Sequence, residues 1–463
     1  ARINYLATQY SLDRWVKNAL HTFRLTSNDV MNHRKEPLVE EFFRDIRAVA
    51  EAIQVIYHTP IPKELTEILP VQMPKYSMKR EKNVLERRIR VSFEYADAEF
   101  LYVTPVDEVS DEYWKIRYNQ LGVNDEFTEG IKEYWRHAQL NLLDVKRNED
   151  GTYTPTFIVL EPDYLVDISA LAECYREYGS HPANYIMSRL VPIDNARPLL
   201  LGNIANLFLD EWIYASEEEP EYLDCMKKVF KRYSVELAAC EELLDKEQET
   251  TFSKDCKMHF EHIRQTVRDT FLESGYNLDK SDAVLEPSYI CEALGVQGRL
   301  DYMQRDMSSF IEMKSGKADE YAIKGKLEPK ENNRVQMLLY MAVLEYSMGI
   351  DRRKQHPYLL YTRYPLLYPA RASWAQVRRI IALRNRIVAA EYGTQMHNHP
   401  SYTAELLAQI NPVTLNEKKL QGRFWEQYLA PGIINFQKHL QPLDDLEKTY
   451  LYTLYNFITK ELY

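Results

Sequence analysis

The sequence has few cysteines, no long apolar run and no excess of positive charge. Its five cysteines lie far apart in 463 residues and form no C-x-x-C pair, so neither a disulfide framework nor a self-contained zinc site is expected. The apolar runs are much shorter than the roughly 20 residues that a membrane span needs. The first residues lack the order of a secretory signal. We therefore expect a soluble, cytoplasmic protein with no membrane partner.

The chain is longer than one hydrophobic core normally organises, and two to four domains are expected. Apolar periodicity predicts a helical region over 1–84. Short alternating runs over 85–165 predict a β-rich, barrel-like domain with an inserted helix at 124–138, for which the OB fold is a candidate. Strands alternating with helices predict a mixed α/β domain over 166–392. Residues 393–463 are expected to be helical.

The charge of the chain is unevenly distributed. The net charge is −11, and residues 210–249 are strongly acidic. Residues 351–390, in contrast, carry nine Lys or Arg side chains against the single Asp351. Such a stretch can attract phosphates even on an acidic protein, although a solvated helix face is the alternative.

Three charged residues interrupt the apolar pattern of two expected strands, 296–304 and 309–314. Alternation puts Asp301 on the polar face of the first strand, and Glu312 and Lys314 on one face of the second. If the strands pair, the three side chains meet at one edge. Two close carboxylates repel unless a cation lies between them, and such oxygens suit Mg²⁺ or Mn²⁺. An ammonium beside the metal can position an attacking water or balance charge on a phosphorane-like transition state.

An aspartate followed by Glu-x-Lys after apolar β residues resembles the PD-(D/E)xK nuclease superfamily. Gly298, three residues before Asp301, is similar to the G-x-x-D strand of its RecB-like branch. Gln336 and Tyr340 in "NRVQMLLYMAVLEY" resemble the Q-x-x-x-Y helix of that branch. The resemblance implies a restriction-endonuclease-like mixed sheet flanked by helices and a metal-dependent nuclease activity.

Over residues 139–392 the likeness is more particular. "LEPSYICEALGVQGRLDYM", "FIEMKSGK", "LLYT" and "ALRNRIV" resemble the nuclease region of flap-processing helicase-nucleases. Those relatives hold an iron-sulfur cluster with one cysteine before and three after the core. Cys174 matches the first position, but no cysteine follows Cys291, so we expect no cluster. No G-x-x-x-x-G-K-[ST] loop exists here. The chain is therefore expected to be a free-standing nuclease, or to work with a helicase that lies in a longer parent chain or a separate subunit.

The resemblance assigns roles to single residues. Asp301 and Glu312 would ligate the metal together with the backbone carbonyl of Met313. Lys314 would position the water, and Gln336 and Tyr340 would support the centre.

Two further metal ligands are expected less directly. Asn206 in "GNIAN" stands where the family's G-x-x-x-H helix has a histidine, and a structural asparagine is the alternative. Glu286, fifteen positions before Asp301, would engage a second cation.

The basic stretch follows the expected catalytic helix, which favours a role in tracking phosphates. The arginines expected to contact DNA are Arg299, Arg363, Arg379, Arg384 and Arg386. Arg384 and Arg386 are the better candidates within the stretch.

The sequence therefore predicts a Mg²⁺- or Mn²⁺-dependent nuclease acting on single-stranded or flap DNA in replication or repair. A nucleic-acid-binding or scaffolding module with a decayed centre is one alternative, because Asn206 replaces the histidine. A restriction-type endonuclease is another. Cleavage polarity, DNA against RNA preference and oligomeric state are left open by the sequence.

Overall fold

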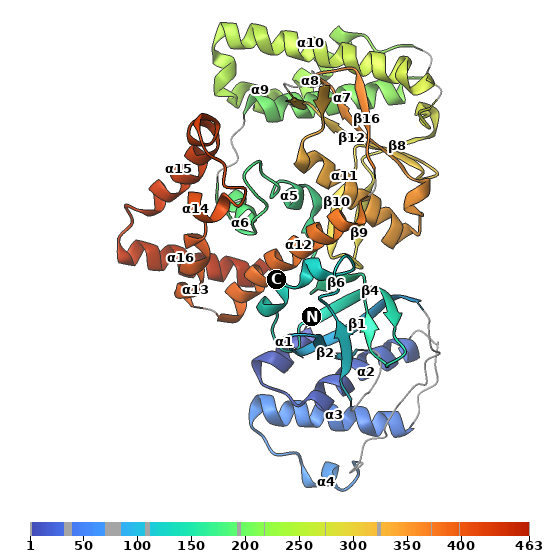
Figure 1. Ribbon diagram of the computed structural model, residues 1–463, viewed down its shortest axis with the longest axis vertical. Helices are drawn as coiled ribbons and strands as arrows, with labels where there is room; N and C mark the ends of the chain where they lie inside the picture. Colours follow the sequence, from blue (N-terminus) through green and yellow to red (C-terminus); the bar gives the residue numbers. More distant parts are fainter. Residues whose placement is uncertain are drawn as a thin grey trace. The chain divides into compact units, whose positions relative to one another are not determined.

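The computed structural model divides into two compact units, unit 1 and unit 2 (Figure 1). Unit 1 comprises residues 1–165, 292–295 and 378–392, and unit 2 the remainder. The structure describes residues 2–31, 39–69, 85–106, 112–191, 196–216, 218–273, 275–321, 326–371, 373–397 and 399–462. The boundary expected after residue 84 lies outside these described residues.

The N-terminal part of unit 1 is helical, as the apolar periodicity predicts. Its helices are α1 (Arg2–Gln9), α2 (Arg14–Met31), α3 (Val39–Tyr57) and α4 (Lys63–Thr66). Ala7, Leu12, Val16 and Ala52 form a small apolar core between α1, α2 and α3.

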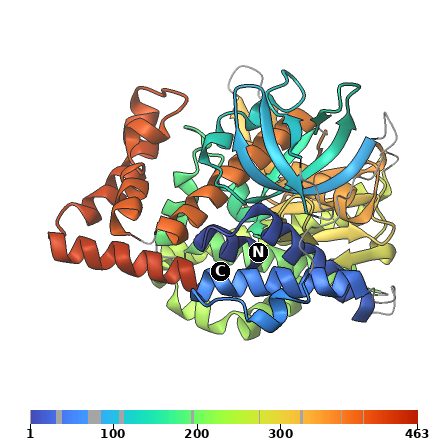
Figure 2. The ribbon, with the colours of Figure 1, turned by 90° about the horizontal axis from the view of Figure 1, so that it is seen from below.

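Unit 1 also contains a closed five-stranded barrel, which confirms the barrel-like domain expected over 85–165. Its strands are β1 (Leu85–Ala96), β2 (Phe100–Pro105), β3 (Trp114–Arg117), β4 (Gln139–Arg147) and β5 (Tyr153–Thr154), and β6 (Phe157–Leu160) adds to β4. The order is β1-β2-β3-β5-β4, and β4 pairs again with β1. Figure 2 shows these strands curving around the barrel.

A buried ammonium fixes α2 to the barrel. Lys17 Nζ lies 2.9 Å from His137 Nδ1 and 3.2 Å from Glu94 Oε1, and it donates to the Ser92 hydroxyl. Burial alone would raise the pKa of Glu94, but the hydrogen bond with His137 and the charge of Lys17 outweigh it and lower the pKa to about 2. The expected regions 1–84 and 85–165 thus share one compact unit.

The helix expected over 124–138 is instead two short 3₁₀ turns, η1 (Asp125–Phe127) and η2 (Gly130–Glu133). Gly130 disfavours helix, and Tyr134 already has an extended backbone with φ −78° and ψ 146°. The backbone therefore extends toward β4 here and does not follow the helical pattern of the local sequence.

Arg384 lies inside unit 1 on α12 (Trp374–His397), and its side chain is fully buried. Its guanidinium donates to the carbonyl oxygens of Gly295 (3.1 Å), Glu161 (2.9 Å), Leu160 and Tyr164. The prediction that Arg384 contacts DNA is therefore wrong, because a phosphate cannot reach it. Burial lowers its pKa to about 10.

Unit 2 contains a mixed five-stranded sheet of order β16-β15-β12-β11-β8, which confirms the mixed α/β class. Only β12 and β15 run parallel in it. Its strands are β8 (Ala283–Leu285), β11 (Tyr302–Gln304), β12 (Ser309–Lys314), β15 (His356–Tyr361) and β16 (Leu366–Pro369). A smaller sheet joins β7 (Val166–Asp167), β10 (Val296–Arg299) and β9 (Ser288–Cys291), and β13 (Asp319–Tyr321) pairs with β14 (Lys326–Glu328).

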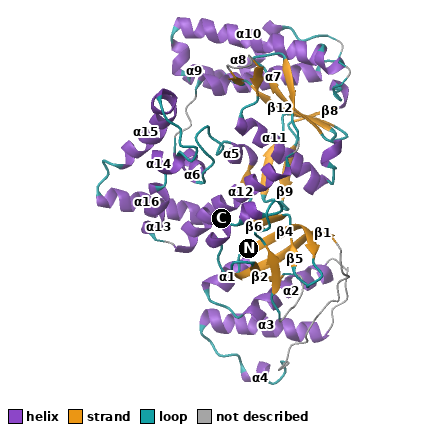
Figure 3. Ribbon diagram, viewed as in Figure 1, coloured by secondary structure: helices purple, strands orange, loops and turns teal. Residues whose placement is uncertain are grey.

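Helices cover the five-stranded sheet of unit 2 (Figure 3). One face, with Tyr302, Ile311, Met313, Tyr358 and Leu360, shares a core with α7 (Arg197–Tyr214), α8 (Tyr222–Arg232) and α10 (Lys246–Arg268). On β12 the opposite face carries Glu312 and Lys314, which meet α11 (Glu331–Val343).

The remaining helices of unit 2 lie around this frame. They are α5 (Ile168–Ala172), α6 (Ala183–Leu190), α9 (Ser234–Ala239), α13 (Pro400–Ala408), α14 (Pro412–Leu415), α15 (Ala430–Leu440) and α16 (Asp445–Leu462). Short 3₁₀ turns are η3 (Glu241–Leu244), η4 (Thr270–Leu272), η5 (Lys280–Asp282) and η7 (Arg352–Lys354), whereas η6 (Leu344–Met348) and η8 (Trp425–Leu429) are π-helical turns. Residues 393–397 and 399–462 are mostly helical, as expected, and they belong to the same unit as the five-stranded sheet. Within the described ranges, no helix is both long and apolar enough to span a membrane.

The single strand expected over 296–304 is two strands that belong to different sheets. The backbone turns at Leu300 and Asp301, where Leu300 N donates to the Pro287 carbonyl and Glu286 N donates to the Asp301 carbonyl, each at 3.1 Å. These bonds hold β8 and β9 against the turn. Simple alternation therefore does not determine where the Asp301 side chain points.

We predict that Arg384→Met lowers the free energy of unfolding by about 3 kcal/mol or more, because buried carbonyl groups lose their donors. Arg379→Ala, on the exposed side of the same helix, should change it by less than about 0.5 kcal/mol. Urea unfolding measures both. Equal stability of the two variants would contradict this role of Arg384.

Glu161 should make unit 1 less stable as the pH rises from 4.5 to 7. Burial raises its pKa from 4.5 to about 7, so over this range the folded state binds the proton more tightly than the unfolded chain. We expect Glu161→Gln to raise the free energy of unfolding at pH 8 by up to about 3 kcal/mol and to change it little at pH 4. The exposed Glu149→Gln is the control; a benefit equal at both pH values would argue against the prediction.

Candidate active site

Glu312, Lys314 and Gln336 form a compact polar triangle on one face of β12. Lys314 Nζ donates to Glu312 Oε1 at 2.9 Å and to Gln336 Oε1 at 2.8 Å. The Gln336 amide donates back to Glu312 Oε1 at 2.6 Å and to the Ser169 hydroxyl at 3.2 Å. Alternation along the strand places Glu312 and Lys314 together, and α11 supplies Gln336, so the structure brings together three residues singled out from the sequence.

Asp301 reaches the same place from the turn before β11. Its Oδ2 accepts the backbone N–H of Met313 at 2.7 Å. The pairing of β11 with β12 ends at Tyr302 and Ile311, so the carboxylate caps an edge where no strand continues. The N–H and C=O of one strand residue point to the same edge. The carbonyl of Met313 therefore faces the side on which Asp301 lies.

The electrostatics of this site disfavour two bare carboxylates. Burial, followed by the charge of Asp301, raises the pKa of Glu312 to about 8. Burial also raises the pKa of Asp301. For Lys314, burial lowers the pKa, but the carboxylate of Glu312 outweighs it and the pKa is raised. Additional positive charge would stabilise the ionised forms of Asp301 and Glu312.

Tyr340 ties the start of the Asp301 turn to α11. Its buried hydroxyl donates to the Arg299 carbonyl at 2.6 Å. Gly298 lies directly beneath this hydroxyl, because a Cβ at position 298 would lie 3.0 Å from it and 3.1 Å from Ile168. Gly298 and Tyr340, recognised as separate motif positions, therefore belong to one packing contact that fixes the backbone two residues before Asp301.

One face of α7 lies beside the site. Gly202 lies against Ser315, whose hydroxyl would be 3.4 Å from a Cβ at position 202. Asn206 and Asp210 follow at helical spacings of four. Burial, then the charges of Glu286 and Asp301, raise the pKa of Asp210 to about 6, which puts Asp210 in their electrostatic field.

Sequence reasoning missed Asp210. Asp210 stands four residues after Asn206 on the same helix face, a spacing that could have indicated it, although it also begins the acidic stretch 210–249. Asn206 is half-buried and lies one turn before Asp210. Glu286 is half-buried next to the Asp301 turn and pairs with Arg299 at 3.2 Å.

The donor set fits a divalent cation in its chemistry. Glu312 Oε2 is buried and has no hydrogen-bond partner, so it is an acceptor that a cation would satisfy. Carboxylate oxygens with a backbone carbonyl are hard ligands of the kind that Mg²⁺ and Mn²⁺ prefer. Within the described ranges, no three His, Cys, Asp or Glu side chains lie close enough to form a metal-binding group.

The five arginines expected to contact DNA are divided between the two units. In unit 2, Arg299 is exposed beside Glu286, and Arg363 lies 3.7 Å from Asp255. In unit 1, Arg379 is exposed and Arg386 pairs with Glu133 at 3.4 Å, whereas Arg384 is the buried residue described above. Only Arg299 and Arg363 belong to the unit that contains the site.

The cysteines are buried free thiols. Burial raises the pKa of Cys174 to about 12, and its thiol donates to the Ala170 carbonyl at 3.4 Å.

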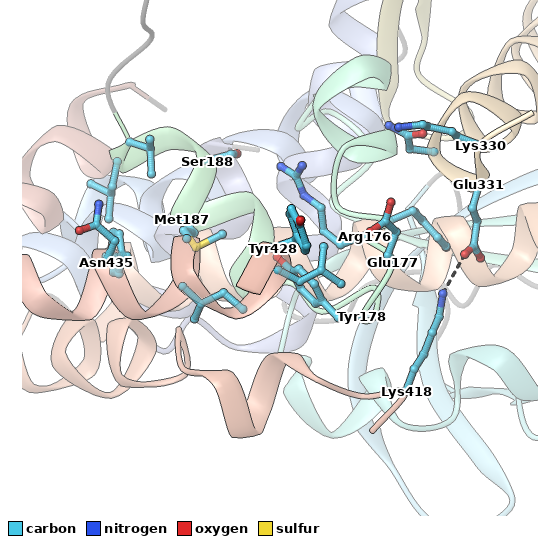
Figure 4. Close-up of a pocket in the computed structure, with 18 of the residues that line it drawn as sticks. Arg176, Glu177, Tyr178, Met187, Ser188, Lys330, Glu331, Lys418, Tyr428 and Asn435 are labelled. Atoms are coloured by element: carbon cyan, nitrogen blue, oxygen red, sulfur yellow. Dashed lines mark hydrogen bonds and ion pairs between the residues drawn. The ribbon is translucent and has the colours of Figure 1, made fainter. Parts of the chain in front are cut away.

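A cavity of about 1290 Å³ lies in unit 2 beside the first turn of α11. Its walls come from residues 175–191, 328–334 and 418–451, so the C-terminal helices help to enclose it. Figure 4 shows Arg176, Tyr178 and Tyr428 among the residues that line this cavity. Aromatic faces and cationic side chains thus line the same space.

The cavity wall continues into the residues that hold the polar triangle. Asn332 lines the cavity one turn before Gln336 and donates to Glu173 Oε1 at 3.0 Å. Lys330, also in the wall, donates its backbone N–H to the Tyr361 hydroxyl at 3.1 Å. Tyr361 is the residue of β15 that pairs with Lys314.

No protein-family model matches the chain, and no curated protein sequence matches it. The proposal for its function therefore rests on the residues and the geometry described above.

We predict that Tyr340→Phe lowers the free energy of unfolding by about 1 kcal/mol, because the Arg299 carbonyl loses its buried donor. Tyr428→Phe, at an exposed tyrosine of the same unit, should be neutral. Thermal unfolding compares the two variants. Identical melting temperatures would mean that the Tyr340 hydroxyl does not hold the Asp301 turn.

Proposed function

We propose that this protein is a divalent-metal-dependent nuclease with a restriction-endonuclease-like core, which hydrolyses phosphodiester bonds in single-stranded ends or flaps of DNA. The observation that carries the proposal is the triangle of the buried Glu312 and Gln336 with the half-buried Lys314, together with Asp301 bound at the next backbone N–H of the same strand.

Each residue of the centre has a physical role in the proposal. Asp301, Glu312 and the Met313 carbonyl would hold the cation, and Glu286, Asn206 and Asp210 offer further oxygens nearby. The cation would supply positive charge to phosphate oxygens as they gain charge. Hydrolysis forms a bond from a water oxygen to phosphorus and breaks one ester P–O bond, so the departing oxygen takes a proton.

Lys314 is suited to the water. An ammonium has three donors, and the described contacts occupy two of them, with Glu312 and Gln336. The third can hold the attacking water or a phosphate oxygen, and the two existing bonds fix its direction. Gln336 is a positioning residue in this scheme.

The cavity beside α11 is the proposed binding site for an extended, single-stranded substrate. Arg176, Lys330, Arg334 and Lys418 bring cations to its lining, although Arg176 is paired with Glu173 at 3.4 Å and Lys418 with Glu331 at 3.0 Å. Tyrosine faces in the same lining can stack on unpaired bases. Paired bases do not expose their faces, so stacking favours single strands over duplex.

We predict that Asp301→Ala, Glu312→Ala and Lys314→Ala each slow Mg²⁺- or Mn²⁺-dependent cleavage of an end-labelled single strand about 100-fold or more. Lys317→Ala, at an exposed lysine three residues further along, is the matched control. Gel analysis of the products and a thermal melt separate lost chemistry from lost folding. Equal activity in the wild type and all three variants would sink the proposal.

Calorimetry with Mn²⁺ distinguishes a proposed metal ligand, Asp301, from Lys314, whose ammonium does not bind the metal in this scheme. Asp301→Asn should abolish binding, whereas Lys314→Met should retain it. If the wild type binds no Mn²⁺ but still binds single strands with strong salt dependence, the decayed binding module is favoured. Discrete fragments from plasmid DNA, in place of trimmed single strands, would favour a restriction-type endonuclease.

A further inference from the structure

The outer face of the barrel in unit 1 carries aromatic and basic side chains in register across three strands. Tyr95 on β1 pairs with Tyr102 on β2, which pairs with Lys115 on β3. In the neighbouring row, Phe100 pairs with Arg117. We call these five residues the barrel ladder.

The side chains of the ladder point away from the barrel core. Leu101, Val103 and Ile116, which alternate with them along β2 and β3, are fully buried, so the ladder residues occupy the opposite face. Tyr95 is 48% exposed. These rings are therefore placed on the surface without a share in the core of the barrel.

The rings and cations of the ladder contact one another. Tyr95 and Tyr102 stack with centroids 4.3 Å apart and planes 13° from parallel. The Lys115 ammonium lies 5.8 Å from the centroids of both Phe100 and Tyr102, and the Arg117 guanidinium lies 5.0 Å from Phe100. Cation–π contact of this kind keeps positive charge beside exposed rings.

A further aromatic ring and a carboxylate lie beside the barrel ladder. Tyr113 packs edge-on against Tyr95 at 5.7 Å. Asp97 accepts hydrogen bonds from the Tyr102 hydroxyl and from the N–H groups of Glu99 and Phe100, so its carboxylate is committed to the turn between β1 and β2. Arg117 is paired with Asp150 at 2.9 Å, which leaves Lys115 as the better phosphate partner.

We propose that the barrel ladder is a second binding site, for single-stranded nucleic acid, separate from the catalytic centre. Unpaired bases have exposed faces that continue the stack begun by Tyr95 and Tyr102, and their phosphates match Lys115 in charge. A closed five-stranded barrel of the OB type uses the face of its second and third strands for oligonucleotides. β2 and β3 carry four of the five ladder residues.

The test is binding of fluorescein-labelled oligothymidylate of about 16 nucleotides, an upper site size for one such barrel. Anisotropy is read on the full chain in EDTA, so cleavage does not interfere. Tyr95→Ala should weaken binding about tenfold, the loss expected for one stacking ring. Tyr95→Phe should retain binding, and Tyr95→Leu, which is apolar but has no ring, should not. Tyr57→Ala, at a 70% exposed tyrosine of the same unit, is the control.

Lys115→Gln tests the charge. It should reduce the slope of log Kd against log salt by about 0.7, the share of one phosphate contact on a single strand. Oligouridylate and a duplex of equal length form the other arms: oligouridylate distinguishes RNA from DNA as the source of the strand, and the duplex should bind more weakly than either.

Three results would overturn the inference: no single-strand binding by the wild type at low salt, unchanged binding by Tyr95→Ala, or full binding by Tyr95→Leu. Its failure is distinguishable from failure of the proposed nuclease. Hydrolysis of bis(4-nitrophenyl) phosphate with Mn²⁺ reports on the catalytic centre alone and should not change in the ladder variants. A wild type that binds through the ladder but leaves this diester intact would sink the nuclease and keep the ladder.

Discussion

The candidate site depends on one constraint, the need to pair the ammonium of Lys314 where water is scarce. A buried charge is costly unless it is paired and hydrogen-bonded. Glu312 meets the charge, and Gln336 supplies the second acceptor. Because Gln336 is on α11, the pairing also fixes where that helix lies on the sheet. Glu312 itself remains under strain, because its second oxygen has no partner and because burial and the charge of Asp301 raise its pKa to about 8 even though the contacts with Lys314 and Gln336 lower it. Glu312 Oε2 therefore remains an acceptor that a cation can satisfy.

Much of this site follows from local periodicity. Alternation within β12 is enough to put Glu312 and Lys314 on one face, and the spacing of four puts Gln336 and Tyr340 on one side of α11. The barrel could be expected because short alternating runs and turn residues are visible along the chain. These are properties of neighbouring residues, and tertiary contacts did not overrule them.

The parts that could not be predicted depend on contacts between distant segments. Asp301 owes its position to hydrogen bonds with the segment at 286–287, and Asp210 owes its relevance to the packing of α7. Arg384 also depends on contacts between distant segments, and for this residue the sequence led to a wrong prediction. A sequence shows that an arginine is charged, but not that four carbonyl groups will surround it.

The carbonyl groups around Arg384 are synthesised long before Arg384 itself, and this order has a consequence for folding. Unit 1 is not continuous in sequence: the barrel ends near residue 165, but residues 292–295 and 378–392 are built into the same compact unit. During translation the barrel strands leave the ribosome more than 200 residues before Arg384. Until then the carbonyl groups after β6 must be satisfied by water or by a chaperone. Completion of the first unit therefore waits for most of the second to be synthesised, and a fragment cut after residue 165 would lack the residue that closes it.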